Sequence, residues 1–290
     1  MKHSSVLLAL VALGCTTRFD FETTAAGGAG GTSEVTTASA GGIGGAGAGG
    51  EAGAGGGALV LSCRDPAMAL VPKPLGGWYC IDATEVTRTA YDPFAGMQST
   101  QAGLCAWNTT FVPDVTGLCA GAWPPGQQGE LPVVCVDWCD AYGYCAQAGK
   151  RLCETSETGS FADPMLSEWF NACSRAGVLQ FPYGDLYNAT ACNGGDIMPE
   201  GLVDVGSFVG CEGGYPGIYD MSGNAWEWIG GPGACTTWTG AADVCFAAGG
   251  ASYAGQAALR CSTISAPTDF TRATAQHRLG FRCCADAMGP

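Results

Sequence analysis

Cysteine gives this sequence most of its potential for chemistry, with 17 among 290 residues. Thiolates bind soft metal ions and act as nucleophiles, whereas in an oxidising compartment they pair as disulfides. No two cysteines have the Cys-x-x-Cys spacing of a zinc site, and His277 is the sole histidine after position 3. Zinc is therefore not expected. Because the count is odd, at least one cysteine cannot pair within the chain. If that cysteine is Cys15, after the N-terminal apolar run, and it carries lipid, sixteen remain, enough for eight bridges.

Hydrolase patterns are incomplete as well. A Ser–His–Asp triad would have to use His277, which lies in a segment of Thr and Ala. The segment Gly250-Ala251-Ser252-Tyr253-Ala254 departs from a nucleophile elbow at its last residue, where glycine is required. We interpret Cys135 and Cys139, and the adjacent Cys283 and Cys284, as disulfide partners.

The first 15 residues form a predicted signal peptide. Lys2 and His3 precede the apolar run 6–13, and Ala12-Leu13-Gly14 leads into Cys15. This order resembles the lipobox of bacterial lipoproteins, with the aliphatic and small residues swapped, and implies lipidation at Cys15. The alternative is an ordinary secretory signal cut at the same bond. Either way we expect export to a bacterial cell envelope, as an outer-membrane lipoprotein or in the periplasm.

Residues 16–60 are predicted to be a flexible tether. From 23 to 58 the chain is almost entirely Gly, Ala, Thr and Ser, with Glu34 and Glu51 as its only charges. Such a composition offers no apolar face to bury, so it favours a coil with a mean span of roughly 30 Å. Residues 61–290 then form the one expected domain.

The charge of the chain excludes one class of partner. The formal net charge is −14 and the isoelectric point is about 4.3. Nucleic-acid binding rests on Lys and Arg, so we expect no nucleic-acid partner, and membrane contact only through the N-terminal lipid. The acidity itself is explained by solubility.

Two helices are predicted to shape the domain. A helix over 138–148 follows from apolar spacing, with Asp137 as N-cap and Gly149 as the residue after the C-terminus. A second helix is predicted from Pro164, after an N-cap at Asp163, to Gly177. Its predicted buried residues are Leu166, Trp169, Phe170 and Cys173. Elsewhere Gly, Pro and Asn favour short strands joined by loops.

Six segments, in this order, resemble the formylglycine-generating enzyme (sulfatase-modifying factor) family. The most specific runs from Gly217 to Trp228, close to the signature Gly-Leu-Tyr-Asp-Met-x-Gly-Asn-x-Trp-Glu-Trp. The others are Trp78–Thr87, Leu131–Leu152, Phe181–Asp185, Gly249–Tyr253 and Gly280–Cys283. The resemblance implies an α+β fold, related to C-type lectins and poor in regular structure. An insertion of roughly ten residues at 157–166 departs from the family.

The resemblance also implies disulfides and a metal site. The implied bridges are Cys145–Cys283 and Cys173–Cys261, while spacing alone suggests the pairs Cys192–Cys211 and Cys235–Cys245. The positions that supply one calcium site in the family hold Asp220, Gly223, Ala225 and Glu227. Carboxylates and loop carbonyls suit Ca²⁺, so calcium is the expected cofactor. The alternative is that Glu227 and Asn224 bond the loop's own backbone.

Catalytic members bind Cu(I) between two thiolates five residues apart, the first two residues after Gly-Ser-Tyr. Here Ser252 and Tyr253 occupy the family's active-site position, but Gly255 follows and 256–260 contains no thiol. Copper is therefore not expected.

The sequence predicts a non-catalytic protein that binds a protein or glycan ligand, or serves in assembly, at the cell surface. The binding site is then expected in the loops of 96–130 and the insertion at 157–166. The alternative is a copper-dependent formylglycine-generating oxidase acting on a sulfatase cysteine, with Cys284 and an unpaired neighbour binding copper near the Ser252 and Tyr253 groove.

Overall fold

The computed structural model describes residues 61–289 except 100, 102, 127, 158–159 and 267. These residues all belong to one compact unit, 56–290. The predicted signal peptide and tether, with Cys15, lie outside the described residues. Within the described part, none of the helices combines the length and apolarity that a membrane crossing needs.

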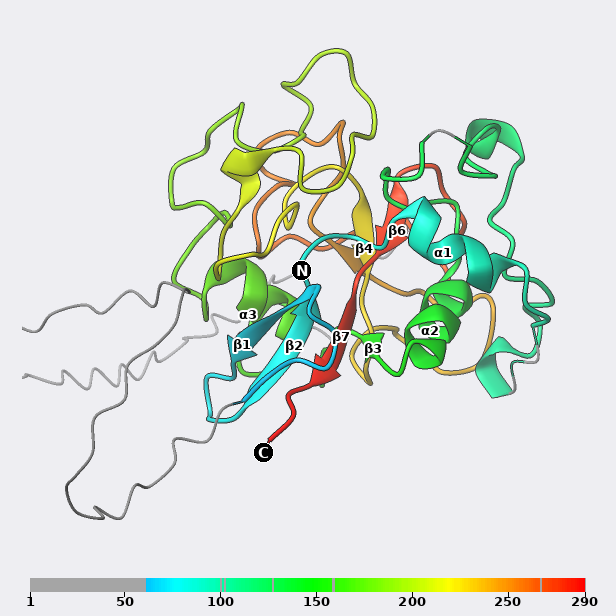
Figure 1. Cartoon of the computed structure of the whole chain (residues 1–290), viewed down its shortest axis with the longest axis horizontal. Helices are drawn as coiled ribbons and strands as arrows, with labels where there is room; N and C mark the ends of the chain where they lie inside the picture. Colours follow the sequence, from blue (N-terminus) through cyan, green and yellow to red (C-terminus); the bar gives the residue numbers. More distant parts are fainter. Residues whose placement is uncertain are drawn as a thin grey trace, which may run out of the picture. The chain divides into compact units, whose positions relative to one another are not determined.

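A four-stranded antiparallel sheet joins the two ends of the domain (Figure 1). Its order is β1-β2-β7-β3, with strands β1 (Met68–Pro72), β2 (Trp78–Asp82), β7 (Cys283–Asp286) and β3 (Arg151–Leu152). Strands β1 and β2 form a hairpin in full register. Gly76 and Gly77 make its turn possible because both have positive φ, at 99° and 88°.

A second, three-stranded sheet carries the most specific sequence motif. Its order is β5-β4-β6, with strands β5 (Ala247–Ala248), β4 (Trp226–Trp228) and β6 (Leu279–Phe281). Strand β4 pairs antiparallel with β5 and parallel with β6. Because β6 and β7 are separated only by Arg282, the last strands of the chain link both sheets and place Arg282 between them.

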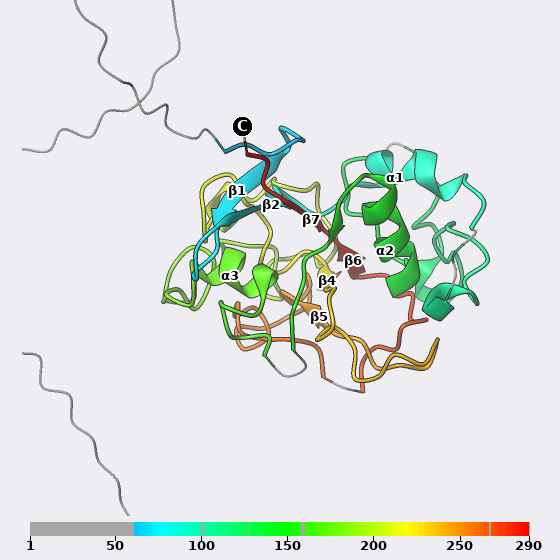
Figure 2. The same ribbon diagram turned by 90° about the horizontal axis from the view of Figure 1, so that it is seen from below.

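Three short α-helices flank the strands: α1 (Arg88–Ala95), α2 (Trp138–Gln147) and α3 (Glu168–Ser174). Figures 1 and 2 show α1 and α2 on one side of β6 and β7, and α3 on the other. Three single 3₁₀ turns lie at Gly103–Cys105, Gly117–Cys119 and Val209–Cys211.

The helix expected at 138–148 is confirmed as α2. The Asp137 side chain accepts from the backbone of Asp140, whose carboxylate accepts from Asp137 N–H in return, which forms a capping box. Gly149 follows the helix at φ 70°, a conformation that glycine adopts without strain.

The second helix begins later than predicted. Helix α3 starts at Glu168 with Ser167 as its N-cap, and Asp163 instead accepts from Met165 N–H in a turn. Tertiary pairing explains the difference: Thr155 bridges Ser167, and Ser156 N–H donates to the Leu166 carbonyl. This pairing holds 163–167 out of helical geometry, so Leu166 is only half-buried.

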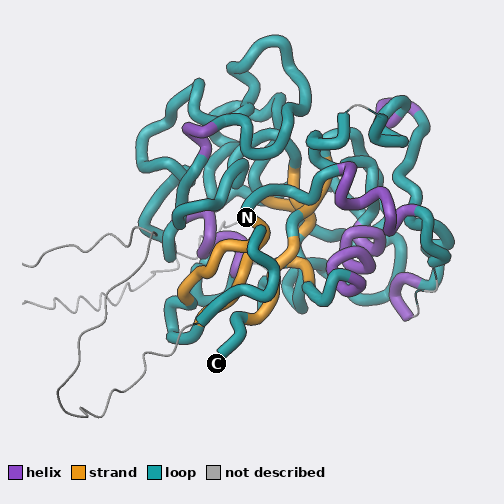
Figure 3. The backbone as a smooth tube through the Cα atoms, in the orientation of Figure 1, coloured by secondary structure: helices purple, strands orange, loops and turns teal. Residues whose placement is uncertain are grey.

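Loops make up most of the domain (Figure 3). Aromatic side chains such as Trp169, Trp228, Tyr79 and Phe281 fill the core between the two sheets and α3. Disulfide bonds add to the stability that this core provides, because closing long loops restricts the conformations of the unfolded chain. The eight disulfides are Cys63–Cys80, Cys105–Cys139, Cys119–Cys135, Cys145–Cys283, Cys153–Cys284, Cys173–Cys261, Cys192–Cys211 and Cys235–Cys245.

Candidate functional site

The family's active-site position contains no reactive thiol. Ser252 is fully buried, its N–H donates to the Asn224 carbonyl, and its hydroxyl has no partner among the described residues. Tyr253 is 44% exposed, and its hydroxyl accepts from Trp226 Nε1 at 3.0 Å. Arg278 lies 5.0 Å from the ring centroid of Tyr253. These groups can hold one another in place, but they supply neither a thiolate nor a paired base.

Disulfides occupy every cysteine from Cys63 to Cys284. The four pairs expected from the family and from spacing are all present. Cys135 and Cys139 do not pair with each other; each bonds to a cysteine of the preceding loop. Cys284 is bonded to Cys153, so the alternative in which Cys284 and an unpaired neighbour bind copper is wrong for the described chain.

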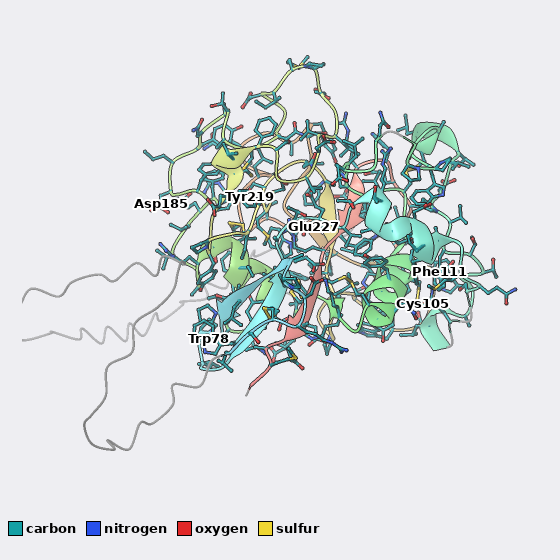
Figure 4. All side chains as sticks on the ribbon, in the orientation of Figure 1. Trp78, Cys105, Phe111, Asp185, Tyr219 and Glu227 are labelled. Carbon is teal, nitrogen blue, oxygen red and sulfur yellow. A yellow bond between two sulfur atoms is a disulfide. The ribbon has the colours of Figure 1, made fainter. Side chains whose placement is uncertain are left out.

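Four ionisable side chains are buried at the centre of the domain: Glu85, Asp220, Glu227 and Arg282. Figure 4 labels Glu227. Both Glu227 carboxylate oxygens accept from Arg282, at 2.7 Å each, and Trp169 Nε1 donates to the same carboxylate at 2.8 Å. Arg282 also donates to the Tyr219 carbonyl. Since Glu227 and Arg282 are each fully buried, this pair is the main electrostatic contact between β4 and the last strands.

Glu85 and Asp220 are the other two members of this centre. Burial, together with the charges of Asp220 and Glu227, raises the pKa of Glu85 well above its usual range. Burial also raises the pKa of Asp220, whose carboxylate accepts from Gly206 N–H. Neither carboxyl oxygen of Glu85 has a hydrogen-bond partner among the described residues, so burial favours its neutral acid form.

Three of the predicted calcium ligands, Asp220, Gly223 and Ala225, lie in a buried segment just before β4, and Glu227 lies in β4 itself. Glu227 does not fit a calcium site as arranged here, because Arg282 already occupies both of its oxygens and opposes a second cation. The described residues contain no group of three or more His, Cys, Asp or Glu side chains arranged to hold a metal. Calcium binding stays a prediction that rests on Asp220 and the carbonyls of Gly223 and Ala225. The alternative, in which Glu227 and Asn224 bond the loop's own backbone, is wrong for Glu227, whose partners are the Arg282 and Trp169 side chains. Asn224 bonds the backbone of Val203 and the side chain of Asn193.

A cavity of about 1070 Å³ opens beside α2. Helix α2 contributes Trp138 and Tyr142, the segment 97–111 forms one wall, and 231–238 forms the other. The first wall falls within the predicted loops of 96–130, and Figure 4 labels two residues near it, Cys105 and Phe111. Sequence reasoning missed the second wall with Trp238, because no motif marks it.

None of the described insertion residues, 157 and 160–166, lines this cavity. Pro164, Met165 and Leu166 line a separate cavity of about 290 Å³ beside β1 and α3. This cavity is too small for more than a compact ligand. The two regions predicted for binding therefore line different cavities, which have Glu154 in common.

Known proteins similar to this chain are formylglycine-generating enzyme relatives. Mouse inactive C-alpha-formylglycine-generating enzyme 2 is 31% identical over 176 residues, covering 56% of this chain and 51% of its own length. Bovine formylglycine-generating enzyme is 32% identical over 114 residues, covering 34% of this chain and 26% of its own length. The chain thus spans about half the length of the first of these relatives, and less of the second.

Two solved structures resemble the fold at low identity. CarF shares 21% identity at a TM-score of 0.47, covering 72% of this chain and 86% of CarF. PvdO from Pseudomonas aeruginosa shares 21% identity at a TM-score of 0.46, covering 79% of this chain and 98% of PvdO. The sequence pattern of the sulfatase-modifying factor enzyme 1-like domain matches residues 74–287. The chain therefore belongs to the sulfatase-modifying factor enzyme 1-like domain family.

Proposed function

We propose that this protein is an exported, lipid-anchored member of the family that performs no oxidation and instead binds a ligand or an assembly partner at the cell surface. One observation carries the proposal: all sixteen cysteines from 63 to 284 are consumed by disulfides. A disulfide sulfur cannot act as the thiolate that selects cuprous ion.

The residues at the active-site position support the same proposal. Ser252 is buried and Gly255 stands where the first copper-binding cysteine would be. The next cysteine, Cys261, is bonded to Cys173 at the end of α3. The mouse relative is named as an inactive enzyme, which is a precedent for a family member without the activity.

Export is supported by the number of disulfides. Eight bridges in one domain are typical of proteins in oxidising compartments, because cytosolic thiols are kept reduced. The remaining cysteine of the sequence is Cys15, which follows the predicted signal peptide. Lipidation there would account for the odd cysteine count and would place the anchor before the predicted tether.

A turnover assay tests the proposal that this protein lacks the oxidase activity of catalytic family members. The mature protein is incubated with Cu(I), oxygen and a reductant weak enough to leave the disulfides intact, and with a Cys-x-Pro-x-Arg peptide. We expect no aldehyde product, while a catalytic family member converts the peptide to the aldehyde under the same conditions. Formation of the aldehyde by the purified protein would refute the proposal.

A further inference from the structure

We infer that the cavity between α2, 97–111 and 231–238 binds a neutral carbohydrate chain. This inference rests on the proposed binding role and assigns it a site and a ligand class. We call the site the aromatic groove and define it by Trp138, Tyr142 and Trp238 with the glutamines Gln98, Gln101 and Gln147.

The aromatic rings of the groove form one connected platform. Trp138 and Tyr142 are one helical turn apart on α2 and stack with ring centroids 5.1 Å apart and planes 11° apart. Trp238 meets Trp138 edge to face at 5.9 Å. Tyr142 is 48% exposed and Trp238 is 40% exposed, so both rings present surface to the groove. Flat exposed rings suit the C–H faces of sugar rings.

The indole N–H groups are already used within the protein. Trp138 Nε1 donates to the Ile229 carbonyl at 2.8 Å, and Trp238 Nε1 donates to the Pro232 carbonyl at 3.3 Å. The two indoles therefore have no free N–H for a ligand, and the ring surface open to a ligand is that of Trp238 and Tyr142, since Trp138 is buried. Hydrogen bonds must come from other side chains on the walls.

Both walls of the groove are fixed in place. The disulfide Cys105–Cys139 ties the 97–111 wall to α2, and Cys235–Cys245 closes the loop that carries Trp238. Rigid walls reduce the conformational entropy that a ligand would otherwise have to remove.

A buried ion pair fixes the second wall further. The Arg272 guanidinium lies 4.5 Å from the Trp138 centroid and 4.8 Å from the Trp238 centroid, so it holds the two rings together. Arg272 pairs with Asp243 at 3.2 Å, and Asp243 also accepts from Thr237 and Thr239 on either side of Trp238. Burial would raise the pKa of Asp243, but these hydrogen bonds and that of Gly240 hold it well below its usual range. An exposed tryptophan is thus held by a buried network.

The polar groups of the groove are planar and mostly uncharged. Gln98, Gln101 and Gln147 are amides, which can donate and accept at once, and Glu154 adds one carboxylate. The Gln101 Nε2 atom is buried and has no hydrogen-bond partner among the described residues. A buried amide without a partner is costly, so a ligand oxygen placed there would be stabilised. Sugar hydroxyls satisfy donors and acceptors together.

The charge of the groove decides between ligand classes. Among the described residues no Lys or Arg lines it, and Glu154 would repel a phosphate, sulfate or uronate. The volume of about 1070 Å³ is at the upper end of small-molecule pockets, roughly 300–1,000 Å³, so more than one sugar ring fits. Amides around exposed rings favour a hydroxyl-rich neutral ligand over an apolar peptide.

The test is an array of neutral and anionic glycans probed with the full mature protein, followed by calorimetric titration of the best neutral glycan. Trp238→Ala is expected to weaken binding roughly tenfold or more, because it removes half of the exposed platform. Gln101→Leu is expected to weaken it several-fold without a change in size. Trp78→Ala is the matched control: Trp78 on β2 is 42% exposed and lies outside the groove.

Thermal unfolding of each variant shows that the fold is intact. Binding of neutral glycans that Trp238→Ala and Gln101→Leu weaken and Trp78→Ala leaves unchanged supports the inference. The inference is overturned if no neutral glycan binds, if anionic glycans bind equally well, or if an apolar peptide library selects ligands that displace the glycan. The turnover assay on the same preparation separates the two claims, since aldehyde formation contradicts the function and loss of glycan binding contradicts only the site.

Discussion

At the scale of single residues, the buried centre beside β4 contains two kinds of carboxyl group. Glu227 is an anion held by Arg282, whereas the pKa of Glu85 is raised by burial, which favours its neutral acid form. The same residue type therefore has opposite charge requirements within one cluster. Replacing each of them with glutamine is therefore expected to affect stability differently.

Glu227→Gln is expected to destabilise the domain strongly. It leaves the Arg282 guanidinium buried without a counter-ion, which costs about 3–5 kcal/mol. Glu85→Gln, its matched control in the same cluster, is expected to change the unfolding free energy at neutral pH by less than about 1 kcal/mol or to raise it, because the amide resembles the neutral acid. Denaturant unfolding measures both. Equal losses in the two variants would contradict the charge assignment.

Glu85 also predicts a dependence of stability on pH. Its pKa in the folded protein is raised above the value of 4.5 in the unfolded chain. The folded state therefore binds more protons, so its contribution to stability is complete below about pH 4.5 and is lost as pH rises through the folded pKa. Glu85→Gln lacks this loss. Unfolding titrations at successive pH values should show that the unfolding free energy of Glu85→Gln increases relative to that of the wild type as pH rises above 4.5. A difference that stays constant with pH would exclude the effect.

At the scale of the elements, α3 shows how tertiary contacts set a helix boundary. Both Asp163 and Ser167 are residues that can cap a helix, and the sequence favours Asp163 because a proline follows. The Ser167 hydroxyl is the one that accepts from a helical N–H, that of Phe170. Strand-like pairing with 155–156 decides between the two caps.

Ser167→Ala is expected to cost about 1 kcal/mol of stability, the usual loss for an N-cap. Asp163→Ala is the comparison, because it removes only the exposed turn bond to Met165 N–H and should cost less. Thermal unfolding of the two variants measures the difference. A larger loss for Asp163→Ala would place the start of the helix at Pro164.

The sequence predicts those elements that local rules determine. Helix α2 follows from apolar spacing and the cap Asp137, and the family motifs identify the Cys145–Cys283 and Cys173–Cys261 bridges. The Arg282–Glu227 pair and the second wall of the aromatic groove could not be predicted. The first joins residues that are 55 positions apart in the chain, and the Arg272–Asp243 contact that supports the second wall joins residues 29 positions apart. Contacts between residues so far apart have no local signature in the sequence.

At the scale of the whole molecule, the proposed anchor and tether make the location of the protein testable. Cys15→Ser is expected to move the protein from the membrane fraction to the soluble exported fraction, because a serine cannot carry the thioether-linked lipid. The disulfide pattern of the exported domain should not change. Fractionation followed by immunoblotting measures the distribution. Equal membrane association of the variant would contradict lipidation at Cys15.

The disulfides decide what the whole domain can do. The two longest loops are closed by Cys145–Cys283 and Cys153–Cys284, across 138 and 131 residues. These bonds join α2 and the residue after β3 to the last strand. In the chain-entropy model, a loop of this length stabilises the fold by roughly 4–5 kcal/mol. The eight bridges also leave no free thiol among the cysteines from 63 to 284, and this is separate from the absence of a cysteine at Gly255 and in 256–260.

The most direct test is a map of free thiols and disulfides, by alkylation and mass spectrometry, on the mature exported protein. The account predicts eight bridges with the pairing described above and no alkylated cysteine between 63 and 284. Two free cysteines close together in the fold would contradict it and would become the first residues to mutate in search of an oxidase.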